Sequence, residues 1–162
     1  MSTLFVDSIN EKTSGNGVAI PGHVLQVVNA TVNAAQSTSS SSFTDTTLNA
    51  SITPKSSSSK ILVICQPVIR VYNNGGADAR GDFRIVRGST EVSKFRARSY
   101  DYGTSGSILD TSESIVALDS PATTSSTTYT LQYKKADGAQ VELNPGGSAN
   151  DISTLTLMEI GA

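Results

Sequence analysis

The sequence predicts an all-β protein, and three observations predict it. Ser and Thr together make up about a quarter of the 162 residues, and glycine is plentiful, a composition that suits pleated strands joined by many turns. Apolar and polar residues alternate along short segments, most clearly in residues 127–143, "TTYTLQYKKADGAQVEL". No segment keeps a 3.6-residue period over helical length. Together these features favour an antiparallel β-sandwich or jelly roll.

Strand and turn signals alternate from residue 23 to the end of the sequence. We expect about eight to ten strands, within residues 23–32, 47–52, 60–72, 82–87, 90–100, 115–118, 127–136, 140–143 and 152–160. Alternation places Leu48, Ala50 and Ile52 on one face of their strand. The polar stretches 34–46, 73–81 and 101–107 are predicted to be connections, with Phe43 as the one obvious anchor of the first.

Two short motifs predict local geometry. Pro67 interrupts an apolar run, and because proline has no backbone donor we expect a bulge or an edge position there. Asp137 and Gly138 are residues that a tight hairpin turn demands. The sequence therefore predicts a hairpin in which one strand carries Tyr129, Leu131 and Tyr133 on one face, and the partner strand carries Val141 and Leu143.

The serine run 56–59, in "TPKSSSSKILV", is either a linker between two domains or a turn within one. The strand before it offers about three inward side chains, too few for an independent core. We therefore expect one domain, residues 23–162, with the serine run as a surface turn between two of its strands.

Residues 1–22 read as a separate extended segment. A short strand signal, "TLFVDSI", is followed by a loop with three glycines and a proline. A lone strand needs a partner, which we expect to be a later strand of the same chain, another subunit or another protein, the last by addition of a strand to its sheet. The candidate attachment residues are Leu4, Phe5, Val6 and Ile9. The segment has no basic and apolar signal-peptide pattern, and no stretch has the apolar length of a membrane span.

Composition excludes several kinds of function. A net charge of −2 does not suggest binding to nucleic acid, which needs a basic face. His23 is the one histidine and Cys65 the one cysteine, which leaves no cluster for zinc and no Ser-His-Asp pattern. Asp78 and Asp82 match no calcium loop. We therefore expect no catalytic residue, no metal and no cofactor, and we expect Cys65 to be a small buried hydrophobe.

One constellation is a candidate contact surface. Tyr and Arg are enriched where proteins meet partners. The candidate residues are Tyr72, Asn73, Asn74, Arg96, Arg98, Tyr100 and Tyr102. The alternative interpretation of the last four is one ordinary strand face followed by a loop.

Three stretches resemble short tail-fibre-like structural proteins of tailed, especially marine, bacteriophages. They are the opening "STLFVDSINEKTSGNGVAIPGHVLQVVNA", the segment "FTDTTLNASITPKSSSSKILVICQPVI" and the terminal "STLTLMEI". The resemblance implies a jelly roll similar to the C1q and tumour-necrosis-factor fold, assembled as a homotrimer. It also implies attachment to the virion through the N-terminal segment and no enzyme activity. The chain lacks the shaft of longer fibres, so a stubby fibre, a knob or a capsid decoration fits its length better.

We therefore expect a virion structural protein, made in the host cytoplasm and carried on a phage tail or capsid. Its expected partners are copies of itself and, through residues 1–22, another virion protein. The alternative is a receptor-binding module that recognises a host-surface glycan or protein through its loops. Trimer packing would also explain why residues 61–65 and 155–160 are more apolar than one small core requires.

Overall fold

The structure is a computed structural model that describes residues 8, 10, 22–76, 78–100, 106–138 and 140–162. These ranges contain strands and no helix, which confirms the all-β prediction. The strands are β1 (Val24–Val32), β2 (Gln36–Thr38), β3 (Thr44–Ile52), β4 (Lys60–Gln66), β5 (Val68–Asn73), β6 (Asp78–Arg87), β7 (Thr90–Tyr100), β8 (Ser107–Ser112), β9 (Ile115–Asp119), β10 (Thr127–Asp137), β11 (Gln140–Leu143) and β12 (Ser153–Ile160).

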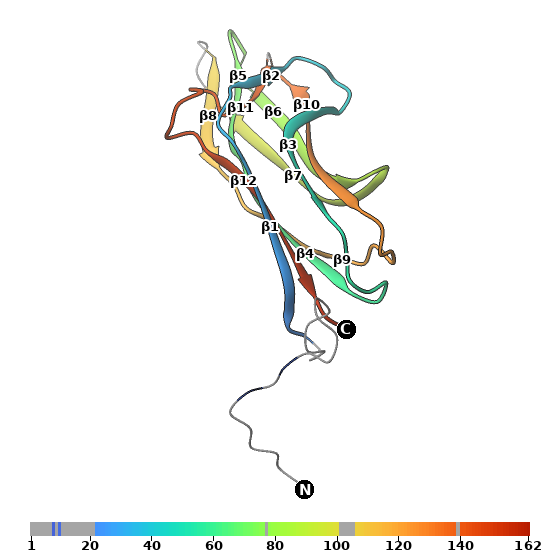
Figure 1. The fold of residues 1–162 in the computed structure, drawn as a ribbon. Coiled ribbons are helices and arrows are strands. Elements are labelled where there is room, and N and C mark those ends of the chain that lie inside the picture. Colours follow the sequence, from blue (N-terminus) through green and yellow to red (C-terminus); the bar gives the residue numbers. More distant parts are fainter. Residues whose placement is uncertain (1–7, 9, 11–21, 77, 101–105, 139) are drawn as a thin grey trace, which may run out of the picture.

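The strands form three four-stranded antiparallel sheets. We call them sheet A (β1-β12-β4-β9), sheet B (β2-β11-β5-β8) and sheet C (β3-β10-β6-β7). Sheets A and B lie end to end, since Pro67 alone separates β4 from β5 and two residues separate β8 from β9. They form one layer of a sandwich and sheet C forms the other (Figure 1). The predicted β-sandwich is confirmed.

The core lies between the two layers and follows the predicted alternation. Leu48, Ala50 and Ile52 face inward from β3, and Tyr129 and Leu131 face inward from β10. Tyr133 completes that β10 face, and the opposite layer contributes every second residue of β4, β5, β11 and β12. Burying these side chains supplies the main driving force for folding, at roughly 25 cal/mol per Å² of apolar surface.

The predicted hairpin at Asp137 and Gly138 is wrong. The chain turns there, with Gly138 at φ 88°, but β10 pairs with β3 and β6 whereas β11 pairs with β2 and β5. The turn therefore passes the chain from sheet C to sheet B. Val141 and Leu143 face Tyr133 and its neighbours across the core and do not stand beside them in one sheet. The dipeptide encodes a turn, but it does not encode which strand becomes the partner.

Pro67 lies in the middle of a layer and not at an edge. Its neighbours β4 and β5 both have strands on either side, and Pro67 itself is buried between them. The ladder is broken at this residue, as its missing donor requires. The predicted bulge-like interruption is therefore found, and the predicted edge position is not.

The strands differ from the sequence expectation in four places. β2 lies inside the predicted connection 34–46, β8 precedes the single strand expected near residue 115, β3 begins at Thr44 instead of residue 47, and β6 begins at Asp78 instead of Asp82. β2 has three polar residues and one partner strand, so backbone pairing holds it without any hydrophobic alternation. The additional strands β2 and β8, together with the division of the predicted strand 60–72 into β4 and β5, raise the nine expected segments to twelve strands in the described ranges.

The serine run is a turn between β3 and β4, as predicted, and a buried carboxylate organises it. Glu159, on β12, is fully buried. Its Oε1 accepts a hydrogen bond from the Lys55 amide at 2.8 Å, and its Oε2 accepts one from Gln26 Nε2 at 2.5 Å. Burial alone would raise the pKa of the Glu159 carboxyl, but the hydrogen bonds from Gln26 and the turn backbone outweigh it and hold the pKa below its ordinary value.

Candidate assembly interface

The outer face of sheet A carries a continuous apolar row. Because registered residues in antiparallel strands point to the same side, strand pairing aligns four side chains across the sheet. Val27 of β1 pairs with Met158 of β12, Met158 with Leu62 of β4, and Leu62 with Leu118 of β9. The two ends of the row are exposed, Val27 at 55% and Leu118 at 56%. The row crosses the whole sheet without a polar side chain.

A second row lies beside the first and is apolar over half its length. It runs from Asn29 through Thr156 and Ile64 to Val116, which is 61% exposed. Asn29 Nδ2 donates to Thr156 Oγ1 at 2.8 Å, so the polar half satisfies its own hydrogen bonds. At the other side of the first row, Val24 pairs with Ile160. We call the apolar members of these rows the sheet A patch: Val24, Val27, Leu62, Ile64, Val116, Leu118, Met158 and Ile160.

Sheet C presents a charged outer face on the opposite side of the sandwich. Ion pairs link neighbouring strands there: Asp82 of β6 accepts from Arg96 of β7 at 2.5 Å, and Asp78 accepts from Arg98 at 3.1 Å. The pKa of each of these two carboxyls is held below its ordinary value, by Arg96 for Asp82 and first by Arg80 for Asp78. One layer is therefore built to face water, and the other has an apolar outer face.

Sheet B forms the polar half of the layer that contains sheet A. Arg70 of β5 binds Asp110 of β8 through two hydrogen bonds, at 2.5 and 2.7 Å, and reaches Glu142 of β11 at 3.4 Å. Tyr72 donates to Gln140 at 2.7 Å. Sheet B has one exposed large apolar side chain on this face, Ile108, which pairs with Tyr72. The continuous apolar rows of the layer are those of sheet A, which is the half that holds the first and last strands of the domain.

The predicted contact residues fall into two groups that meet at one end of the sandwich. Tyr72, Asn73 and Asn74 end β5, beside a hollow of about 200 Å³. Arg96, Arg98 and Tyr100 lie on β7, where the Arg98 guanidinium stands 5.2 Å from the Tyr100 ring centre. Asn73 joins the groups, because its Nδ2 donates to the Asp78 backbone at 2.8 Å and Asp78 binds Arg98.

Arg96 stands apart from that junction, since it pairs with Asp82 further along the sheet. Tyr102 and the attachment candidates Leu4, Phe5, Val6 and Ile9 lie outside the described residues.

The two ends of the sandwich differ in what they hold. Gly22 donates to the Gly161 carbonyl at 2.7 Å, and Gly161 donates to the His23 carbonyl at 2.9 Å. The start of β1 and the end of β12 are thereby held side by side at one end (Figure 1). The Asn73 junction lies at the other end, where β5 ends and β6 begins.

The described residues assemble no cluster of metal ligands. Within the ranges given above, no three His, Cys, Asp or Glu side chains lie together as metal ligands. Cys65 is fully buried, and burial raises the pKa of its thiol to about 12, so it is a core residue. No helix in the described part of the chain is long and apolar enough to cross a membrane.

Comparison with known proteins finds no protein-family model and no curated protein that matches the chain. The geometry of the chain itself therefore carries the functional argument.

Sequence reasoning found the excess of apolar residues in β4 and β12 but not their arrangement. In the sequence, Leu62 and Ile64 are apolar at positions that the alternation of β4 directs away from the core. Met158 and Ile160 have the same property in β12. Val27, Val116 and Leu118 come from strands with weak signals, and only the pairing shows that they extend the same rows.

Proposed function

We propose that this protein is a non-enzymatic structural subunit of a tailed-phage virion, a short trimeric fibre, knob or decoration. The single observation that carries the proposal is the sheet A patch. Eight apolar side chains on the outside of one sheet would favour aggregation unless they are covered. Copies of the same chain are the simplest cover, since most soluble oligomers are homo-oligomers with closed symmetry.

The path of the chain supports a jelly roll of the C1q and tumour-necrosis-factor kind. Four pairs of successive strands stay in the A–B layer, β1–β2, β4–β5, β8–β9 and β11–β12, and β6–β7 is a hairpin of sheet C. Every other step along the chain passes from one layer to the other. Resemblance of the sequence to phage fibre-like proteins implies the same fold and a homotrimer. The patch lies on the layer that holds the first and last strands, so three copies would bring their first strands close together.

Attachment to the particle falls to residues 1–22. The Gly22–Gly161 contact places the origin of this segment at the end of the sandwich opposite the Asn73 junction. A subunit held there would project its opposite end into solvent. Strand addition by Leu4, Phe5, Val6 and Ile9 to a partner's sheet edge remains our proposed mechanism.

The test is the solution mass of the full chain by light scattering after size exclusion. A trimer, near three times the 16.9 kDa subunit, is the expected result. A monomer at all concentrations would contradict self-assembly through the patch. Deleting residues 2–20 should leave the number of associated subunits unchanged but abolish incorporation into particles. Retained incorporation would contradict the attachment proposal.

The second candidate function is recognition of a host-surface glycan or protein. The observation that favours it is the Asn73 junction, where Tyr72, Asn74, Arg98 and Tyr100 gather at the end away from Gly22. A glycan array with the full chain tests it. Binding that Tyr100→Ala abolishes would support this function, and silence on the array together with stable particle attachment would favour a purely structural role.

A further inference from the structure

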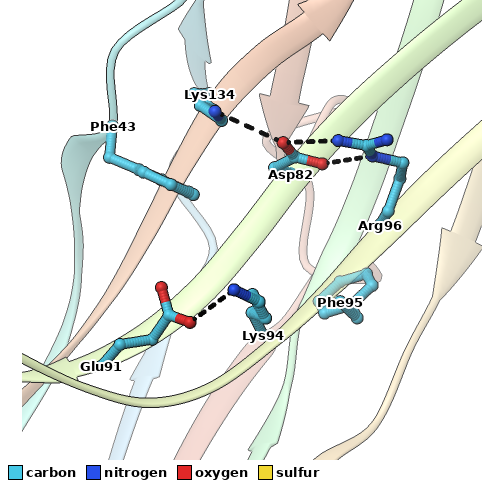
Figure 2. A pocket seen from close by; sticks show the side chains of 7 residues that line it. All are labelled: Phe43, Asp82, Glu91, Lys94, Phe95, Arg96 and Lys134. Atoms are coloured by element: carbon cyan, nitrogen blue, oxygen red, sulfur yellow. Dashed lines mark hydrogen bonds and ion pairs between the residues drawn. The ribbon is translucent and has the colours of Figure 1, made fainter.

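The charged outer face of sheet C contains a hollow of about 370 Å³, large enough for a small ligand. Figure 2 shows the side chains around it, which come from four segments: Phe43 from the residues before β3, Asp82 from β6, Lys134 from β10, and Glu91, Lys94, Phe95 and Arg96 from β7. The hollow lies on the layer opposite the sheet A patch. An inference about it stands whether or not the chain assembles through that patch.

Cations outnumber acids around this hollow. Asp82 is shared by Arg96 at 2.5 Å and Lys134 at 3.5 Å, and Glu91 is shared by Lys94 at 2.9 Å and Arg84 at 3.3 Å. In the lining itself, two carboxylates therefore face three cationic groups, Lys94, Arg96 and Lys134, on a chain whose net charge is −2. Arg and Lys also carry more N–H donors than these pairs use. The site is thus prepared for one additional negative group.

The remaining surfaces of the hollow are not those of a simple anion site. Phe43 lines one side, with the Arg84 guanidinium 3.9 Å and Lys134 Nζ 4.8 Å from its ring centre. Phe95 lines another part and stacks on the buried Phe83 at 4.9 Å. The two carboxylates keep lone pairs that accept hydrogen bonds from hydroxyl groups. A ligand that satisfies all of these groups has an anionic group, several hydroxyls and an apolar ring face.

We propose that this hollow binds a carboxylate-bearing sugar. Arg96 already donates Nε and Nη2 to Asp82, at 2.5 and 3.0 Å, and the two Nη groups at the end of its guanidinium keep a pair of N–H donors for a ligand carboxylate. Lys94 adds a second cation beside it. Asp82 and Glu91 accept from the ring hydroxyls, and the C–H face of the ring packs against Phe43. An inorganic anion would gain from the cations but would also face two carboxylates without any hydroxyl to bridge them. A free acidic sugar and an acidic residue of a polysaccharide present the same carboxylate, hydroxyls and ring face to these side chains.

The test is a titration of the full chain with glucuronate, followed by backbone amide NMR shifts, with glucose and inorganic phosphate as comparison ligands. We expect saturable shifts on β6, β7 and β10 with glucuronate, and binding at least about tenfold weaker for glucose and phosphate, since a charge-assisted hydrogen bond is lost or a hydroxyl set is missing. No saturable shift with glucuronate, or equal binding of phosphate, would overturn the proposal. In the second case the hollow is a general anion site.

A matched pair of variants locates the contact. Arg96 has a side chain that is 55% exposed and pairs with Asp82 in the hollow, whereas Lys60 is an exposed cation at the start of β4 on the opposite layer. We expect Arg96→Gln to weaken glucuronate binding about tenfold or more, and Lys60→Gln, outside the hollow, to leave it unchanged. Equal losses in both variants would overturn the assignment to this hollow. Lys94→Gln, at a side chain that is 70% exposed, gives a second variant that leaves folding intact and should also weaken binding.

Discussion

Leu62 of β4 and Met158 of β12 are direct partners across two neighbouring strands, and both point out of the sandwich. Each sits between residues of the opposite parity that fill the core, so β4 and β12 are apolar on both faces. Strands with two apolar faces are expected where a sheet is covered on both sides. In this protein the domain itself covers only one side, and we propose that copies of the chain cover the other.

A charge placed in the patch should prevent assembly. Leu118→Lys puts an ammonium on an exposed position at the end of the first apolar row, where folding tolerates it. We expect the solution mass to fall from three subunits to one, because burying that charge between copies without a partner costs several kcal/mol. Asn49→Lys, on the exposed outer face of sheet C, is the control and should leave the mass unchanged. A trimer that survives Leu118→Lys would place the interface elsewhere.

Glu159 should contribute to stability through its hydrogen bonds to the serine turn. Glu159→Gln keeps the shape but turns an acceptor into a donor facing the Lys55 amide or Gln26. We expect a loss of about 2 kcal/mol in the free energy of unfolding by urea at pH 7. Glu113→Gln, at the break between β8 and β9, is the control, and its loss should stay below about 1 kcal/mol. Equal losses in the two variants would mean that the turn does not depend on Glu159.

The same carboxylate predicts a pH dependence with a definite sign. Because the folded-state pKa of Glu159 lies below its ordinary value of 4.5, its stabilisation is complete above that value and is lost as the pH falls through the lower folded-state pKa. We therefore expect the stability difference between wild type and Glu159→Gln to shrink as the pH is lowered below 4.5. Urea titrations at several pH values measure it. If the stability difference between the two proteins grew as the pH was lowered, the folded-state pKa of Glu159 would not lie below its ordinary value.

Asn144 should hold together the return from β11 to β12. It is fully buried with φ 51°, its Nδ2 donates to the Val32 carbonyl at 3.1 Å, and its Oδ1 accepts from Ser153 at 2.6 Å. We expect Asn144→Ala to cost about 3 kcal/mol, and Asn144→Gly about 1 kcal/mol less, since glycine tolerates positive φ. Urea unfolding measures both. Asn150→Ala, in the exposed part of the same loop, should leave the free energy of unfolding unchanged. A larger loss for Asn144→Gly than for Asn144→Ala would contradict the argument from positive φ.

Cys65 should be unreactive until the protein unfolds. Its thiol is fully buried, and burial raises its pKa to about 12, so almost no thiolate exists at neutral pH. We expect alkylation by iodoacetamide to be negligible in buffer and fast in concentrated urea, as followed by mass spectrometry. Rapid labelling of the native protein would place this residue at the surface and would contradict the inward parity of β4.

Part of the patch could be predicted from the sequence, and part could not. Leu62, Ile64 and Met158 are apolar at positions that alternation assigns away from the core, which signals a second buried face. Val27 and Leu118 give no such signal, because nothing in the sequence says that β1 and β9 flank β12 and β4. The candidate contact residues show the same limit: Arg98 and Asn73 meet through Asp78, whereas Arg96 belongs to a different site.

The sequence by itself determined the longer strands and their inward faces, but not β2 or β8. The two-residue alternation at Leu48, Ala50 and Ile52 is local, and so is the turn between β6 and β7, where Gly88 has φ 58°, because neighbouring residues alone set the pleat and the backbone angle. Only the tertiary structure decided that β10 and β11 belong to different layers, that Glu159 reaches the serine run, and that four strands align one apolar row. These are pairings between distant segments, and their energies depend on the whole core being formed, so no local pattern specifies them.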